Sequence, residues 1–168
     1  MSDKDTFRET LARRGSPHLL LYSDDPTRLR ECLDGLPEKV FNVWRIEGSH
    51  LTTKEGALRE FALKMRFPDY FGRNWDALRD CLGDLDWGDL DPVHQVVLIQ
   101  DADSISRLGA KEAPILCRIF DDSASGYEHW ETEWAYKVIL QTESASSEAL
   151  IAAIRVNDLE YANLALDG

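Results

Sequence analysis

The sequence predicts an α/β fold in which a small parallel sheet is covered by helices. Residues 95–100 have an unbroken apolar centre, Val96 to Ile99, which is typical of a parallel strand buried on both faces. Further strand candidates lie at Leu19–Tyr22 and at residues 40–46 and 137–141, and segments with helical spacing of apolar residues separate them. Alternating strands and helices joined by short connections favour a parallel sheet with helices packed on it.

The elements before the centre of the chain follow from local signals. The strand at Leu19–Tyr22 precedes a helix that begins at Pro26, because proline is favoured at the first helical position. Residues 40–46 are rich in β-branched and aromatic side chains, which favour a strand. The sequence from Thr52 to Glu55 has the spacing of a capping box, so it predicts a helix capped by Thr52.

The second half of the chain repeats this alternation. A helix is expected over residues 114–122, followed by the strand at residues 137–141 and by a helix that Ser147 caps. His129 is expected in a surface loop before that strand. The tail, residues 159–166, fits a helix or a strand, and its periodicity does not choose between them.

The most informative segment is residues 67–82, which places an aromatic loop in front of a short helix. Pro68 ends the preceding helix because it lacks an N–H group, and Gly72 allows a turn that a side chain would hinder. Asn74 is a good N-cap, since its side-chain oxygen can accept from a free N–H group of the first turn. The spacing therefore predicts a helix that begins just after Asn74.

Carboxylates gather around this helix. Asp76 and Asp80 are four residues apart, so they share a face and repel each other by roughly a few tenths of a kcal/mol. Such a pair indicates a cationic partner. Two arginines, Arg73 and Arg79, lie among seven aspartates between Phe67 and Pro92: Asp69, Asp76, Asp80, Asp84, Asp86, Asp89 and Asp91.

Composition restricts the class of partner. The net charge of −12 repels phosphate backbones, so direct nucleic-acid binding is not expected, whereas a basic protein would be attracted. The longest apolar runs are far shorter than the roughly 20 residues that span a bilayer, and the polar start lacks the apolar stretch of a signal peptide. The three cysteines have no C-x-x-C spacing and fit reduced thiols. We therefore expect a cytoplasmic protein that is monomeric when free.

Residues 67–82 resemble the signature of the barstar family, intracellular protein inhibitors of secreted ribonucleases such as barnase. Ten positions agree in order and spacing: Pro68, Tyr70, Gly72, Asn74, Asp76, Ala77, Leu78, Asp80, Cys81 and Leu82. Weaker similarity extends over residues 40–141. The resemblance implies a barstar-like core of three parallel strands at 40–141, which leaves residues 1–39 and 142–168 as N-terminal and C-terminal extensions. From its own residues, the strand at Leu19–Tyr22 with its helix is expected to be an added βα unit, most simply at a sheet edge.

The resemblance also implies a way of acting. A basic ribonuclease or nuclease toxin would be blocked without chemistry, metal or cofactor, with Asp80 as the central carboxylate in the nuclease site and Asp76 beside it. Tyr70 would pack against a catalytic histidine, and Asp122, or Asp121 in the alternative register, would contact the nuclease margin. The expected partner-binding residues are Tyr70, Gly72, Arg73, Asn74, Asp76, Arg79, Asp80, Gly83 and Asp122.

Three positions depart from the family pattern. Arg79 stands where barstar has a tryptophan, Arg73 where it has an acid and Gly83 where it has a hydroxyl residue. The two arginines are close enough in sequence to pair with Asp76 and Asp80, which would reduce the local negative potential. A nuclease whose surface offers acids to these arginines fits this pattern.

Two other classes remain open. One is an interaction module that keeps the fold but binds a partner that is not a nuclease. The other is a metal-dependent phosphodiesterase, for which Asp76, Asp80 and Asp84 with His94 form the best ligand set. The sequence contains no P-loop motif, G-x-S-x-G motif or C-x-x-C pair to support an enzyme.

Overall fold

The computed structural model describes residues 3–84, 93–130, 133–144 and 147–166. Helices and strands alternate along the chain, as the sequence predicts. The elements are α1 (Asp3–Ala12), β1 (Leu19–Tyr22), α2 (Pro26–Asp34), β2 (Phe41–Glu47), the 3-10 turn η1 (Gly48–His50), α3 (Lys54–Lys64), α4 (Trp75–Gly83), β3 (His94–Gln100), the 3-10 segment η2 (Ala102–Leu108), α5 (Gly109–Trp130), β4 (Tyr136–Gln141), α6 (Glu148–Arg155) and β5 (Tyr161–Asn163).

The strands form one five-stranded parallel sheet in the order β2-β3-β4-β1-β5. The predicted core strands, β2, β3 and β4, are neighbours, and β1 is the added N-terminal strand beside β4. The α/β class and the parallel sheet are thus confirmed. The added strand does not end the sheet, however, because residues 161–163 of the tail form β5 and cover its free side. Of the two alternatives for the tail, helix or strand, the structure shows a strand.

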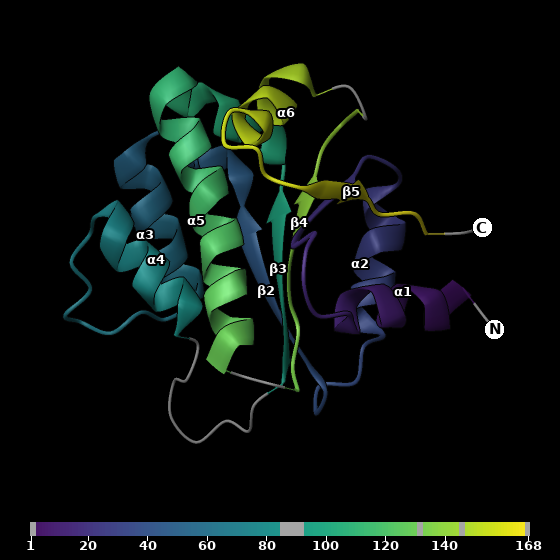
Figure 1. Cartoon of the computed structure of the whole chain (residues 1–168). Coiled ribbons are helices and arrows are strands. Elements are labelled where there is room, and N and C mark those ends of the chain that lie inside the picture. The colour runs from purple at the N-terminus through teal and green to yellow at the C-terminus, as the bar shows by residue number, and fades with distance from the viewer. Residues whose placement is uncertain (1–2, 85–92, 131–132, 145–146, 167–168) are drawn as a thin grey trace.

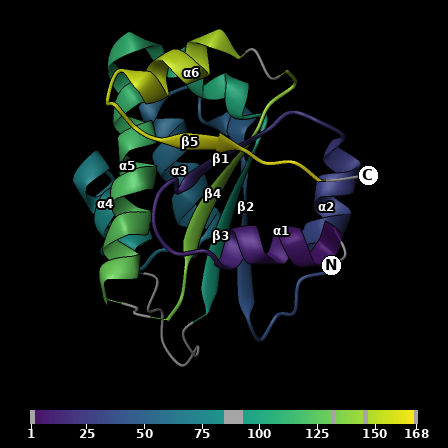
Figure 2. The same ribbon diagram turned by 45° about the vertical axis from the view of Figure 1, so that its right-hand side comes forward.

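Helices cover both faces of the sheet. Helices α3, α4, α5 and α6 bury their apolar sides on one face, whereas α1 and α2 pack on the other. Figures 1 and 2 show these two layers from different sides, with α4 running beside α5. Of the helices in the described residues, none is both long and apolar enough to span a bilayer.

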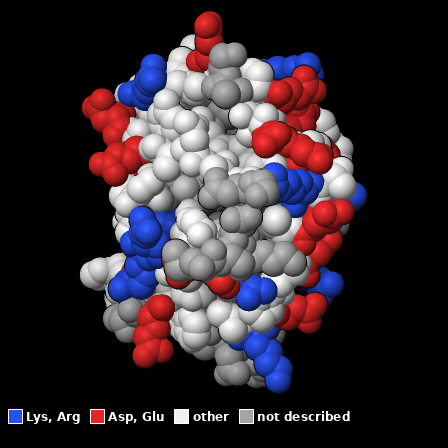
Figure 3. All heavy atoms as spheres, turned by 90° about the vertical axis from the view of Figure 1, so that its right-hand side faces the viewer, with Lys and Arg blue, Asp and Glu red and all other residues white. Residues whose placement is uncertain are grey.

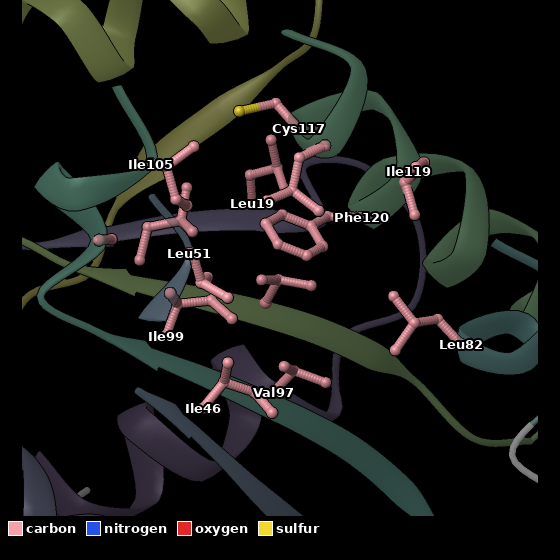
Figure 4. Close-up of a cluster of buried hydrophobic side chains, with 14 of the residues drawn as sticks. Leu19, Ile46, Leu51, Leu82, Val97, Ile99, Ile105, Cys117, Ile119 and Phe120 are labelled. Carbon is pink, nitrogen blue, oxygen red and sulfur yellow. The ribbon is translucent and has the colours of Figure 1, made fainter. Parts of the chain in front are cut away.

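Alternation along each strand explains the two cores. Val97 and Ile99 point to the α5 side with Ile46 and Leu19, whereas Val96 and Leu98 point to the α1 side. Figure 4 shows the larger cluster, where Phe120 and Ile119 of α5 meet the strands and Leu82 arrives from α4. The sheet therefore holds α4 and α5 at fixed positions relative to each other.

Three expected boundaries change in the structure. Thr53, not Thr52, caps α3, because its side chain accepts from the N–H group of Gly56 at 3.0 Å. Helix α5 begins at Gly109, before Pro114, and extends beyond residue 122 to Trp130. Pro114 lies early in the helix, where losing one backbone donor is tolerated. The expectation of a loop at His129 is wrong, since this residue lies in the last turn of α5.

The N-terminal extension is joined to α5 by buried polar contacts. Both His18 ring nitrogens face carboxylates, with Nδ1 at 2.9 Å from Oδ1 of Asp121 and Nε2 at 3.2 Å from Oε2 of Glu128. Glu128 also accepts from the backbone N–H groups of Gly15 at 2.6 Å and Tyr136 at 3.0 Å. A carboxylate only accepts hydrogen bonds when ionised, so this arrangement favours a protonated His18.

Titration of this cluster follows from its contacts. Burial alone would lower the pKa of His18, but the hydrogen bonds to Asp121 and Glu128 outweigh it and raise the pKa to about 9. Burial alone would raise the pKa of Glu128, but the hydrogen bond with His18 and those from Tyr136 and Gly15 lower it. The pair is therefore charged at neutral pH and ties the added βα unit to the core.

Candidate functional site

Helix α4 is capped and anchored as a rigid element. The Asn74 side chain accepts from the N–H group of Ala77 at 2.8 Å and donates to the carbonyl of Gly72 at 3.1 Å, as expected for an N-cap. The Trp75 indole donates to Glu112 at the start of α5, and the Ser123 hydroxyl donates to a carbonyl of α4 at 3.2 Å. These contacts fix the exposed face of α4 relative to α5.

The loop before α4 has a left-handed residue at each of its two ends. Arg66 has φ of 52° and Arg73 has φ of 48°, both in the left-handed region that side chains other than glycine rarely adopt. Gly72 is not among the left-handed residues, but a Cβ atom there would lie 3.2 Å from Nδ2 of Asn74, so a side chain would crowd this turn as expected. Between these arginines, Phe67 and Phe71 pack edge to face at 4.9 Å. Tyr70, which lies between these two phenylalanines in the sequence, is 87% exposed.

A groove of about 910 Å³ lies between this loop, α4 and α5. Its lining combines carboxylates, guanidinium groups and exposed rings from the three elements. The lining residues are Arg66, Pro68, Tyr70, Arg79, Asp80, Cys81, Gly83, Asp84, Asp122, Ser123, Gly126, Tyr127 and Trp130. The volume is in the range of sites that accept a side chain or a small ligand.

Charges around the groove are partly paired. Arg79 lies between Asp76 and Asp122, with 3.6 Å from its Nη1 to Oδ1 of Asp76 and 3.6 Å from its Nε to Oδ2 of Asp122. Arg118 also approaches Asp122, at 3.9 Å. Asp80 is exposed and makes no ion pair with any of the residues that the structure describes. The expected pairing of Arg79 with Asp76 is confirmed, and Asp80 is left as a charged group available to a partner.

The two register alternatives on α5 separate clearly. Asp122 faces α4 and lines the groove. Asp121, one residue earlier, points toward the N-terminal segment and binds His18. Neighbouring residues on a helix point about 100° apart, so one of the two acids is used internally and the other faces the groove.

The structure brings together five of the nine expected partner-binding residues around one groove: Tyr70, Arg79, Asp80, Gly83 and Asp122. The other four do not line it. Gly72, Arg73, Asn74 and Asp76 lie exposed at the start of α4. The expected acids Asp86, Asp89 and Asp91 lie outside the described residues.

Trp130 is a lining residue that the sequence interpretation did not identify. It follows Asp122 and Gly126 at i+8 and i+4, so the three residues share one side of α5. The signal was hidden because the helix was expected to end at residue 122. Had α5 been continued to residue 130, this spacing would have placed the tryptophan beside the expected acid.

The candidate metal set is not assembled. His94 points to the α1 side of the sheet, where its ring contacts Phe41 and Trp134, both at 5.0 Å between centroids. Its Nδ1 accepts from the backbone N–H group of Ala135 at 2.8 Å, and burial lowers its pKa. Asp80 and its neighbours lie on α4, on the other side of the sheet. Within the described residues, no group of three or more His, Cys, Asp or Glu side chains could hold a metal.

The fold of this chain is similar to parts of larger proteins of known structure. A Walker-type ATPase of Pyrococcus abyssi matches 93% of this chain and 47% of its own, with 16% identity and a TM-score of 0.52. The ORC2 protein of Aeropyrum pernix in its ADP form matches 96% of this chain and 46% of its own, with 9% identity and a TM-score of 0.53. The chain thus spans about half the length of these proteins. No curated protein matches the chain.

The turn after β1 (Leu19–Tyr22) does not have the form of a phosphate-binding loop. A P-loop binds phosphate through a glycine-rich turn and a lysine at the start of the next helix. Here Asp24 accepts from the N–H group of Asp25, and Asp25 accepts from the N–H group of Thr27 at the start of α2, both at 2.9 Å. Two carboxylates occupy the donors that a phosphate would need, so these residues do not fit a nucleotide.

The family comparison covers the candidate site. Residues 41–141 match the family described as barstar (barnase inhibitor). This match covers more than half of the chain and extends from β2 through α4 and α5 to β4. It agrees with the resemblance of residues 67–82 and with the three neighbouring core strands. The chain belongs to the barstar family.

Proposed function

We propose that this protein is an inhibitor of immunity or antitoxin type that binds a basic ribonuclease in the cytoplasm and blocks its active site. The observation that carries the proposal is Asp80, an exposed carboxylate without an ion pair among the described residues, held on an anchored helix beside Tyr70. A ribonuclease site is lined with cationic groups that hold phosphates. A rigid carboxylate at the same place competes for them, so inhibition requires no catalytic step by the inhibitor.

The charge distribution supports a basic partner. The net charge is −12, yet on the face formed by α1 and α2 acidic and basic side chains are interspersed around uncharged atoms (Figure 3). On the α4 side, Arg79 lies between Asp76 and Asp122, Arg118 lies 3.9 Å from Asp122, and Asp80 has no ion pair among the described residues. A cationic protein would therefore be attracted to this molecule, and the Asp80 carboxylate on α4 would be available to pair with one of its cationic groups.

The test is inhibition of RNA cleavage by barnase, followed by the same assay with any basic nuclease that co-purifies from the source cells. We expect equimolar inhibition by the wild type and a loss of about 2–5 kcal/mol of binding free energy in Asp80→Asn. This magnitude is based on complexes that include barnase–barstar itself. Glu31→Gln on α2 is the matched control, because it also removes one exposed negative charge but on the other face. Unchanged binding by Asp80→Asn would exclude this orientation.

One observation favours a second candidate, an interaction module with a partner that is not a nuclease. Arg79 neutralises part of the face that a barnase-like site would meet, and Arg73 is exposed beside it. A partner with acidic residues opposite these arginines fits such a face. Affinity capture distinguishes the two candidates: a basic nuclease among the bound proteins supports inhibition, and an acidic partner without nuclease activity supports the module.

A further inference from the structure

The groove carries two exposed aromatic residues, of which the family resemblance accounts for Tyr70 but not for Trp130. Trp130 is 81% exposed and Tyr70 is 87% exposed, and both line the groove. The two other large exposed hydrophobic residues, Leu63 and Val156, lie elsewhere. Within the described part of the chain, the largest exposed rings are therefore concentrated at one place.

Exposed aromatic residues in a groove indicate a binding surface. A tryptophan or tyrosine side chain buries about 150–250 Å² when a partner covers it, and these two types are enriched among the residues that dominate binding energy. Trp130 is held at the end of a long helix whose inner side is part of the core. It is thus presented on a rigid element, which lowers the entropic cost of binding.

The charged residues of the groove lining indicate which chemical group of a partner fits there. Asp80 and Asp122 line the same groove, and Arg79 is already placed between Asp122 and Asp76. Arg66 also lines the groove and Arg118 lies 3.9 Å from Asp122, so the place for a further cation is beside Asp80, which has no ion pair among the described residues. A guanidinium group suits this lining best, since it stacks on aromatic faces and binds carboxylates through two parallel hydrogen bonds.

We propose that Trp130 is a specificity-determining residue of the interface and that, with Tyr70, it receives an arginine side chain of the partner protein beside Asp80 and Asp122. This inference rests on the proposed function for the class of partner. It adds a contact on α5 beyond Asp122, so the partner must cover the last two turns of this helix as well as α4.

An oligoarginine peptide tests the pocket without any nuclease. Anisotropy of a labelled peptide at low salt should show binding to the wild type, weaker binding of oligolysine and none of oligoglutamate. Trp130→Ala should weaken oligoarginine binding by about three- to thirtyfold, the effect of one cation–π contact. Trp130→Phe should retain most of the affinity, and Leu63→Ala, which removes an exposed apolar side chain outside the groove, should not change it.

A second measurement uses barnase. If the wild type binds barnase, Trp130→Ala should weaken the complex while the thermal unfolding temperature stays the same. Wild-type binding to barnase with no loss in Trp130→Ala would overturn the role of Trp130 and leave the proposed inhibition standing. If the wild type does not bind barnase, inhibition of that enzyme fails, and the peptide experiment alone decides. No binding of oligoarginine by the wild type, or equal binding by Trp130→Ala, overturns the inference.

Discussion

Two sides of helix α5 use acidic residues in opposite ways. On one side, Asp121 and Glu128 form hydrogen bonds with His18, and Glu128 also accepts from backbone N–H groups of the N-terminal segment and β4. On the other, Asp122 faces the groove and shares arginines at 3.6 and 3.9 Å, distances longer than a hydrogen bond. The first side holds the fold together, and the second keeps charge available for binding.

The difference shows that the number of acids in a segment does not define their role. Asp121 and Asp122 are chemically identical neighbours, and only the elements packed against each side of the helix distinguish them. Buried carboxylates need partners to offset their desolvation, whereas an exposed carboxylate stays solvated without one. Substitution of Glu128 on the first side should therefore affect unfolding, whereas substitution of the groove acids, Asp122 on α5 and Asp80 on α4, should affect partner binding.

The largest effect on stability is expected for Glu128→Ala. This change leaves the buried, protonated His18 with Asp121 as its one carboxylate partner and removes the acceptor for two backbone N–H groups, so it should lower the free energy of unfolding by about 3–5 kcal/mol. Denaturant unfolding measures the change. Asp80→Ala, at an exposed site, should stay within about 0.5 kcal/mol of the wild type. A small loss in Glu128→Ala would show that the extension is held mainly by its apolar contacts.

The next effect concerns pH and the same cluster. The pKa of His18 is raised to about 9 in the folded protein, so its stabilising contribution is complete below the unfolded pKa of about 6.5 and is lost as the pH rises through 9. Between these limits the free energy of unfolding should fall by roughly 2–3 kcal/mol. Denaturant melts at both ends of this range measure the fall.

His18→Gln is the control for this pH dependence, because glutamine cannot gain a proton. Its unfolding free energy should be lower at acidic pH and should lack the fall assigned to the imidazolium. An equal fall in the variant would assign the pH dependence to other groups. Lys137, whose pKa burial lowers and whose ammonium donates to the carbonyls of Gly15 and Pro17, is the next group in this region.

These two sides also differ in how far the sequence could predict them. The strands at residues 94–100 and 136–141 and the capped helix after Asn74 follow from apolar runs and local capping, which are encoded within a few residues. The pairing of Arg79 with Asp76 was predictable for the same reason, since the two residues lie one helical turn apart.

Contacts between distant segments could not be predicted in this way. The bond between His18 and Glu128 joins residues 110 positions apart, and nothing near His18 in the sequence indicates it. Helix α1 has few apolar residues and was not expected at all, yet Phe7 and Leu11 are buried against the sheet. Trp130 was missed because the helix was expected to end at residue 122, whereas α5 continues to Trp130.

A smaller effect is expected from salt, which should weaken the interactions of the exposed groove acids more than those of the buried Glu128 bound to His18. If the exposed acids steer a basic nuclease, the rate of association with barnase should fall by roughly tenfold between low and high ionic strength, because exposed charges are screened within about 8 Å at physiological salt. The His18–Glu128 contact is buried and screened much less. Stopped-flow rates that stay constant across salt concentrations would remove steering from the account.

The smallest expected effect is the response to metals and nucleotides. A ligand that binds only the folded state raises the melting temperature by mass action, so millimolar Mg²⁺, Mn²⁺ or Mg²⁺ with ATP should produce no shift if the groove and the turn after β1 bind neither. The physical reasons are local: His94 is on the other side of the sheet from Asp80, and Asp24 and Asp25 occupy the N–H donors before α2. Melts in EDTA give the reference. A rise of several degrees with metal that disappears in Asp76→Asn and Asp80→Asn, with nuclease activity lost in the same variants, would replace the inhibitor with a metal-dependent hydrolase. A rise that requires ATP and survives those two substitutions would instead place a nucleotide site at the carboxyl edge of the sheet.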